Sequence, residues 1–233
     1  MNVPATEEEA FVVQEEVRAA ADPVGVGPGV GEVGTVVGVD VTYEEGTDRH
    51  VAAAVVLDAG SLEVVEEVTV AGRGAFPYVP GLLAFREVPS VLAALEKLRT
   101  APDLIVCDGY GIAHPRRAGL AVHLGVVTGV PCFGVAKSPF AFEYQEPGPE
   151  RGAMAPLTDD DGDVVGRAVR TRAGVKPVFV SVGSGIGLDN ACAHTLRLTP
   201  RYRLPETTRR ADHLSRQVLR EAGAVRHNAA HGH

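Results

Sequence analysis

Tryptophan is absent from this chain of 233 residues, and aromatic residues together make up only 5% of it. A hydrophobic core must therefore be built from Val, Leu, Ala and Ile. Such a core is feasible because 45% of the residues are hydrophobic, which is an ordinary share for a globular protein. The length suits one α/β domain or two small ones, and length alone does not decide between them.

Cysteine is also scarce. The three cysteines, Cys107, Cys132 and Cys192, are odd in number and widely spaced, which argues against a disulfide framework and against a zinc site. The sequence has no signal-peptide pattern at its start and no apolar run long enough to span a bilayer. We therefore expect a reduced, cytoplasmic protein that does not associate with membranes.

Positive charge is in deficit, because 22 Lys and Arg residues stand against 30 Asp and Glu residues and the net charge is −8. This balance by itself argues against binding to nucleic acid. The charges are polarised along the chain, however, since residues 165–220 contain eleven Lys and Arg residues and three acidic ones. Two interpretations stay open: a basic face that binds phosphates, or arginines that lie on solvated helix faces.

The first half of the chain reads as a helix followed by strands. Thr6 and Glu9 form a capping box for an acidic helix, and a Gly- and Pro-rich linker follows it. A helix is expected at Leu83–Arg99, in which Pro89 marks a kink or the first turn. Between the linker and this helix, turn residues separate three strands of an antiparallel meander, at Thr35–Tyr43, His50–Leu57 and Leu62–Val70.

The second half alternates between strands and helices, which together with the meander predicts an α/β fold with a mixed β-sheet flanked by helices. We assign residues 1–225 to a single domain and residues 226–233, which lack apolar periodicity, to a disordered tail. The acidic segment Asp159–Asp163 reads as a solvated hairpin turn. The expected elements are strands at Asp103–Asp108, Pro131–Ala136, Val164–Thr171 and Val178–Val182, and helices at Arg116–Thr128, Gly187–Leu198 and Pro205–Ala222.

Three carboxylates are candidates for a metal site. Asp40 interrupts an apolar strand, Asp108 ends another, and Glu87 lies in the helix expected between them. Each has an ordinary explanation by itself: an edge strand exposed to solvent, an Asp-Gly turn, and a helical glutamate. Together they come from elements that can converge on one end of a sheet, where they would offer the oxygen ligands that Mg²⁺ prefers. Such a site supports metal-assisted hydrolysis of a phosphodiester.

Five segments in this order carry a resemblance to a known family: GVDVTY, PYVPGLLAFRE, DGYGIAHPRRAGLAVHLG, GVAKSPF and VSVGSGIGLDNA. They resemble the endonuclease V family over roughly Val37 to Arg216. The resemblance implies a ribonuclease H-like fold and a DNA repair enzyme that depends on Mg²⁺, with Mn²⁺ able to substitute. Its partner would be damaged DNA containing deoxyinosine, or deaminated adenine. It would nick the second phosphodiester bond on the 3′ side and leave 3′-hydroxyl and 5′-phosphate ends.

The resemblance also implies roles for individual residues. Asp40, Glu87 and Asp108 resemble the family's metal-binding catalytic carboxylates. The segment formed by Pro77, Tyr78, Val79 and Pro80 resembles the family's wedge, which separates the strands at the lesion; the alternative is an ordinary Pro-flanked loop. The segment formed by Gly109, Tyr110 and Gly111 resembles part of the family's pocket for the extruded base.

Other positions complete the expected site. Lys137 resembles the family's active-site lysine, and His114 resembles a residue near the scissile phosphate, although it could simply cap the next helix. Further candidates for phosphate contacts are Arg86, Arg116 and Ser138. Asp212 or His213 on the last helix is expected to reach the metal, but not both, since neighbouring helical residues point in different directions.

One departure from the family pattern concerns Ser184 and Gly185, where the family usually has a His-Arg pair. This difference puts nucleic-acid affinity in that region, or the exact substrate, in doubt. Two alternatives to the DNA repair enzyme therefore stay open. One is an inosine-specific ribonuclease on the same fold, which a contact to the ribose 2′-hydroxyl would decide. The other is a catalytically dead protein that binds nucleic acid. The sequence does not give the oligomeric state, and we take the chain to act as a monomer.

Overall fold

One sheet runs through the whole molecule. The computed structural model describes residues 3–230, with side chains described as far as residue 223. The sheet has nine strands in the order β3-β2-β1-β4-β5-β9-β8-β7-β6. Strands β1, β4 and β5 pair in parallel, and all other pairs are antiparallel. The strands are β1 Thr35–Tyr43, β2 Arg49–Asp58, β3 Val64–Arg73, β4 Leu104–Asp108, β5 Cys132–Ala136, β6 Glu143–Tyr144, β7 Met154–Thr158, β8 Val164–Val169 and β9 Val178–Ser184.

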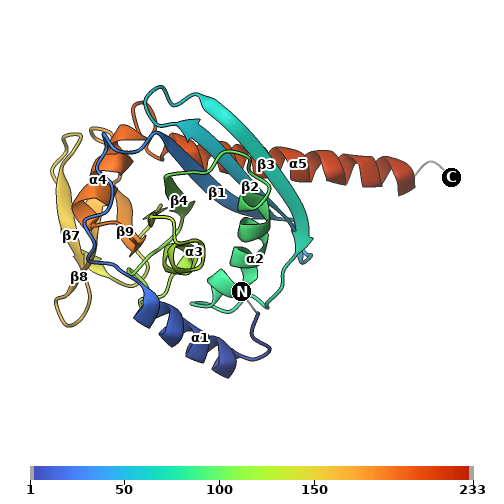
Figure 1. The fold of residues 1–233 in the computed structure, drawn as a ribbon, viewed down its shortest axis with the longest axis horizontal. Coiled ribbons are helices and arrows are strands. Elements are labelled where there is room, and N and C mark those ends of the chain that lie inside the picture. Colours follow the sequence, from blue (N-terminus) through green and yellow to red (C-terminus); the bar gives the residue numbers. More distant parts are fainter. Residues whose placement is uncertain (1–2, 231–233) are drawn as a thin grey trace.

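Helices cover both faces of this sheet (Figure 1). They are α1 Glu7–Ala20, α2 Leu83–Leu95, α3 Leu120–Thr128, α4 Leu188–Arg197 and α5 Glu206–Ala230. On one face, α4 and α5 contribute Ala191 and Ala211 to an apolar cluster with Val36 and Val106 of the sheet. On the other face, α2 and α3 pack against residues such as Val39. The expected α/β class, a mixed sheet flanked by helices, is confirmed.

The parallel strands in the centre place two acidic residues at one edge. In β1 and β4 the residues that precede Asp40 and Asp108 are apolar or glycine, apart from Thr35 at the start of β1, as expected for strands that are covered on both faces. Val39 is paired with Cys107, so the residues that follow, Asp40 and Asp108, lie next to each other where both strands run out of the core. Because parallel strands end on the same side, residues far apart in sequence meet there.

Gly38 allows α5 to lie very close to this edge. A Cβ atom on Gly38 would lie 2.2 Å from the carbonyl carbon of Thr207, a distance that non-bonded atoms do not adopt. Thr207 is in the first turns of α5. The missing side chain therefore lets the helix axis approach β1 and carries the residues further along α5 over Asp40.

Two differences from the expected elements have identifiable causes. The helix expected at Arg116–Thr128 begins only at Leu120, because the preceding residues form turns in which Arg117 adopts a φ of 56°. Strand β7 was not expected at all. Pro156 lies in its middle, and proline in a short run normally argues against a strand, but Pro156 is paired with Arg167 of β8 while its side chain stays exposed.

The ends of the chain partly follow expectation. Thr6 caps α1 by accepting a hydrogen bond from the amide of Glu9 at 3.2 Å, as predicted. Helix α5 continues to Ala230, past its expected end at Ala222, since the sequence there contains alanines and no proline. The predicted disordered tail, residues 226–233, therefore overlaps the helix, and its last three residues lie outside those that the structure describes.

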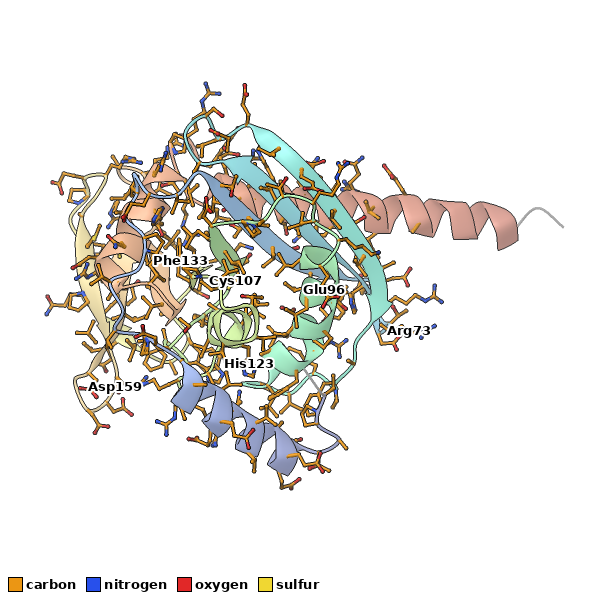
Figure 2. All side chains as sticks on the ribbon, in the orientation of Figure 1. Arg73, Glu96, Cys107, His123, Phe133 and Asp159 are labelled. Atoms are coloured by element: carbon orange, nitrogen blue, oxygen red, sulfur yellow. The ribbon has the colours of Figure 1, made fainter. Side chains whose placement is uncertain are left out.

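The cysteines are buried and none of them forms a disulfide; Cys107 lies in the interior near Phe133, as Figure 2 shows. The predicted turn at Asp159–Asp163 joins β7 to β8 at the edge of the molecule (Figure 2). Within the described residues, no helix is both long and apolar enough to cross a membrane.

The close approach of α5 at Gly38 can be tested directly. In Gly38→Ala the new methyl group must displace the backbone of α5, and overpacking of this kind lowers the free energy of unfolding by about 1–3 kcal/mol. Denaturant unfolding followed by circular dichroism measures the loss. Gly31→Ala is the matched control, because a Cβ atom there meets nothing within 4 Å. Equal stability of the two variants would contradict the role given to Gly38.

Candidate active site

The three predicted carboxylates surround one cavity. Asp40 comes from the second half of β1, Asp108 comes from the end of β4, and Glu87 comes from α2 on the face opposite α5. All three line a cavity of about 140 Å³, whose remaining walls are the apolar residues Val39, Val41, Leu83, Val91 and Leu120. The convergence predicted from the sequence is therefore present.

Asp40 is held by hydroxyl groups. The hydroxyl of Ser215, which is fully buried on α5, lies 2.8 Å from Oδ2 of Asp40, and the hydroxyl of Thr42 lies 3.2 Å from the same oxygen. Burial raises the pKa of Asp40, the Ser215 hydroxyl lowers it, and the negative charges of Asp212 and Asp108 raise it again, so that the net shift is upward. The negative charge at this position is thus costly in the protein alone.

Glu87 is the least compensated of the three. Burial raises its pKa to about 8, with further contributions from the charges of Asp40 and Asp108. Arg86 acts in the opposite direction but does not cancel these effects. Among the described residues Glu87 makes no hydrogen bond and no ion pair. A buried carboxylate without a partner is expensive, so this residue is poised to accept a proton or a cation.

Asp108 is paired with Lys137, which follows the end of β5. The ammonium lies 2.5 Å from Oδ2 of Asp108. Burial lowers the pKa of Lys137, but the hydrogen bond and the charge of Asp108 outweigh this effect and leave the pKa above its usual value. Lys137 is therefore a fixed positive charge at the site, and it cannot serve as a base near neutral pH.

Arg203 holds Lys137 in place through the backbone. Its guanidinium donates to the carbonyl of Lys137 at 2.5 Å and to the carbonyls of Pro177 and Lys176 at 2.7 and 2.9 Å. Three carbonyls from two segments are thereby tied together beside the active site. In the sequence Arg203 is one of the eleven basic residues of the stretch 165–220, and nothing there links it to Lys137.

The last helix contributes Asp212 rather than His213. The charge of Asp212 acts on both Asp40 and Lys137, and its carboxylate pairs with Arg216 at 2.8 Å. His213 is exposed on the surface. Only one of the two neighbours faces the site, as helix geometry requires.

A second and larger cavity adjoins the first. Its volume is about 280 Å³, and it shares Leu83, Asp108 and Leu120 with the carboxylate cavity. The predicted wedge residues Tyr78, Val79 and Pro80 form one wall, and the segment Gly109–Tyr110 forms another. Tyr78 is 71% exposed, so the tip of the wedge projects into solvent. The wedge and the expected base pocket are therefore next to each other.

The residues of the expected base pocket have different tasks. Gly109, with a φ of 142°, has open space where a Cβ atom would stand, which is compatible with the close approach of a ligand. At Gly111 a Cβ atom would lie 1.9 Å from the carbonyl oxygen of Val182, and the Gly111 amide donates to the Ser181 hydroxyl at 2.7 Å. Gly111 thus fixes the loop onto β9, and its amide is not free to read a base.

Two aromatic side chains, Tyr110 and Phe140, line this pocket. The Tyr110 hydroxyl donates to the carbonyl of Ser138 at 2.9 Å, so Ser138 contributes its backbone to the pocket, while its side chain is exposed. Phe140, which is 43% exposed, stands edge-on to Tyr110 with ring centroids 5.5 Å apart. Sequence analysis missed Phe140, although the three aromatics shortly after Lys137, which are Phe140, Phe142 and Tyr144, were a usable signal in a chain so poor in aromatics.

Three side chains that were predicted to contact phosphate or substrate bind other parts of the protein instead. His114 donates from Nε2 to the carbonyl of Gly81 and accepts at Nδ1 from the amide of Arg116, and burial lowers its pKa to about 4. Arg86 donates to the carbonyl of Phe76 and lies over the ring of Tyr43. Arg116 pairs with Glu15 and lies over the ring of Phe11. These residues connect loops around the site.

Most arginines of residues 165–220 are engaged by partners within the protein. Arg170, which is 6% exposed, donates to the carbonyls of Gly148, Pro147 and Val175 and pairs with Glu146. Others pair with nearby acids or bind the linker: Arg167 with Asp189, Arg209 and Arg210 with Glu206, Arg216 with Asp212, and Arg197 with the carbonyl of Val30. Neither of the two interpretations drawn from the sequence describes these residues fully.

The unusual Ser184-Gly185 pair lies away from the carboxylates. Ser184 is paired with Cys132 at the start of β5, whereas Lys137 follows the end of that strand. The Ser184 hydroxyl accepts a hydrogen bond from the amide of Asp22, and the Gly185 amide, at a φ of 71°, donates to the carbonyl of Asp22. This pair therefore anchors the linker that follows α1.

The carboxylate cavity fits a divalent cation in its chemistry. It presents three acidic side chains, and two of them, Asp40 and Glu87, have raised pKa values and make no ion pair with a described residue. Among the described residues, no three His, Cys, Asp or Glu side chains are already arranged around a point where an ion would sit. Asp108 faces Lys137 and Asp40 faces hydroxyls instead. Hard cations prefer such oxygen donors, and the excess negative charge would be relieved by binding one.

Comparisons with known proteins agree on one family. The model of a family described as Endonuclease V matches residues 21–213. A protein from Streptomyces avermitilis named Endonuclease V is 63% identical over 223 residues, which cover 95% of this chain and 96% of that protein. The crystal structure of the Endonuclease V from the same species has a TM-score of 0.92 at 62% identity, and the match covers 95% of this chain and 96% of that one.

A more distant structure contains nucleic acid. It is Ciona intestinalis Endonuclease V in complex with a 24mer DNA containing an inosine followed by a ribo-adenosine. Its TM-score is 0.81 at 28% identity, and the match covers 92% of this chain and 98% of that one. The ribonuclease H-like architecture that the resemblance implied is confirmed by these matches.

The uncompensated charge of Glu87 predicts an unusual pH dependence of stability in metal-free protein. The folded pKa of about 8 lies above the ordinary value of 4.5, so the folded state binds a proton that the unfolded state releases. This contribution is complete below about pH 4.5 and is lost as the pH rises towards 8. In Glu87→Gln the fall of the melting temperature over this range should be shallower than in wild type.

Thermal melts in a metal chelator across pH 5 to 8 measure this slope. The slope, and not the absolute melting temperature, is compared, because a buried amide has its own effect on stability. Glu96→Gln at the other end of α2 (Figure 2) is the matched control, since Glu96 is exposed. Parallel slopes for Glu87→Gln and wild type would show that Glu87 is ionised normally.

Proposed function

The chain belongs to the endonuclease V family and is a nucleic-acid endonuclease, and we propose that it nicks DNA next to deoxyinosine in a reaction that depends on Mg²⁺. One observation carries this proposal. The carboxylate cavity and the larger pocket share Asp108 and two apolar walls. A base held in the pocket would therefore have its own backbone close to the carboxylates.

Asp40, Glu87 and Asp108 would hold the metal, with Asp212 beside them. Bound there, Mg²⁺ or Mn²⁺ would activate water and neutralise the charge of the leaving oxygen. The carboxylates supply the oxygen donors and Ser215 and Thr42 keep Asp40 oriented towards the edge of the sheet. Asp212 is included because its charge already acts on Asp40.

Lys137 provides the permanent positive charge. Its ammonium is held beside Asp108, while Arg203 fixes its backbone. A preorganised cation at this position would stabilise the negative charge that develops on the phosphate during hydrolysis. His114 has both ring nitrogens engaged and a pKa lowered to about 4, so we assign it the positioning of loops and not proton transfer.

The substrate is proposed from the relatives and from the pocket. The Ciona protein binds DNA that contains an inosine followed by a ribo-adenosine, and an extruded hypoxanthine is the ligand we propose for the pocket of this chain. Extrusion requires the strands to be opened, which the Tyr78 wedge beside the pocket would do. Cleavage is proposed at the second phosphodiester bond on the 3′ side, leaving 3′-hydroxyl and 5′-phosphate ends.

A nicking assay with the purified chain tests the function. Wild type with Mg²⁺ should nick a duplex containing deoxyinosine and leave an unmodified duplex intact. Asp40→Asn should reduce the rate by at least about 100-fold, a loss comparable to that of a principal electrostatic group. Asp161→Asn, an exposed acid in the β7–β8 turn, is the matched control and should nick at the wild-type rate.

Three substrates that differ only in their sugars distinguish activity on DNA from activity on RNA. The same site is presented as all-DNA duplex, as DNA with a ribonucleotide after the inosine, and as RNA, all at one salt concentration. Efficient nicking of the all-DNA duplex supports the proposal. Cleavage restricted to the RNA would replace it with an inosine-specific ribonuclease, and binding without cleavage of any arm would exclude catalysis at inosine.

A further inference from the structure

The base of the wedge loop is attached to the N-terminal helix. Gln14 of α1 is fully buried, and its side-chain amide nitrogen lies 2.8 Å from the carbonyl oxygen of Gly81, the residue directly after the wedge. We propose that Gln14 is a positioning residue, through which α1 holds the Pro77–Pro80 wedge ready to open duplex DNA. This inference rests on the proposed function, and Gln14 itself precedes residues 21–213, which match the family model.

Gly81 is the point at which several contacts meet. Its φ of 83° is in the left-handed region that favours glycine. Its carbonyl accepts from Gln14 and, at 3.0 Å, from Nε2 of His114. Both acceptor directions of this oxygen are then used, so the direction in which the chain leaves the wedge is fixed by two buried donors.

Gln14 also reaches the loop that carries the base pocket. Its amide nitrogen lies 3.5 Å from the carbonyl of Ala118, just before α3. Apolar contacts add to these hydrogen bonds, because Ala10 of α1 packs with Phe76, Leu82 and Phe85 around the wedge. In Figure 1, α1 lies outside α3 and the start of α2, away from the sheet. One helix thus joins the wedge to the pocket wall.

The chemistry of Gln14 favours positioning over stability as its task. The amide oxygen Oε1 is buried and has no hydrogen-bond partner among the described residues. Leaving such an atom unsatisfied destabilises a protein, and an apolar side chain of the same length would avoid that loss. What a glutamine adds at this place is the donor that binds Gly81.

The other end of the wedge is held as well. Arg86 donates to the carbonyl of Phe76 at 3.2 Å, directly before Pro77. The wedge is therefore anchored at both ends while Tyr78 at its tip remains exposed. A wedge fixed in advance loses less conformational freedom when it enters the base stack. Duplex substrates, which must be opened, should depend on this anchoring, and single strands should not.

Gln14→Met tests the inference, because methionine keeps the length of the side chain and removes the donor. We expect nicking of a deoxyinosine duplex, measured as kcat/KM, to fall about tenfold, as for a lost buried hydrogen bond, while nicking of a single-stranded deoxyinosine oligonucleotide stays within about twofold. A duplex with mismatches on both sides of the inosine is already open and should restore the rate. Val12→Ala on the same helix, where Val12 is 59% exposed, is the control.

The ratio of duplex to single-strand rates decides the outcome, because loss of folded protein lowers both rates equally. An unchanged ratio in Gln14→Met overturns the inference. Gln14→Glu provides a second variant of the same shape, in which an acceptor faces the Gly81 carbonyl, and its ratio should fall further. Failure of the proposed function would be seen in wild type alone, as no nicking of either inosine substrate.

Discussion

Repulsion between partly buried carboxylates is the constraint around which this molecule is organised. Asp40 and Asp108 lie next to each other on neighbouring parallel strands, and Glu87 faces them from α2 with a pKa raised to about 8. Two compensations are built in, the Ser215 hydroxyl at Asp40 and the Lys137 ammonium at Asp108, and neither serves Glu87. The uncompensated charge of Glu87 lowers the free energy of unfolding, and it leaves a carboxylate that could bind a cation.

The carboxylates stay together because the backbone around them is packed without room to move. Gly38 lets α5 lie directly on β1, and Gly111 lets the pocket loop lie directly on β9. Close backbone contacts of this kind are stiff, since interiors are packed to the density of organic crystals. At both glycines the missing side chain brings two backbones into contact.

The sequence could predict which strands carry acidic residues, and it could not predict contacts between distant segments. Asp40 and Asp108 interrupt or end apolar runs that read as strands, so their convergence at one end of a sheet could be foreseen, although the parallel pairing of β1 with β4 could not. Ser215 is 175 residues from Asp40 and looks like any helical serine, and Gln14 looks like a solvated residue of an acidic helix. Their roles depend on how α5 and α1 dock, which local propensity does not determine.

The same limit applies to charge. Residues 165–220 are rich in arginine, yet Arg170 and Arg203 bind backbone carbonyls, and four others pair with acids. Much of the positive charge that is clustered in the sequence is therefore engaged within the protein. The chain has a net charge of −8, and its cavity is itself acidic. Under the proposed function, the approach of a nucleic-acid backbone would be made favourable locally, by Lys137 and by the cation that the carboxylates would hold. Binding of the substrate and assembly of the catalytic site would then be the same electrostatic event.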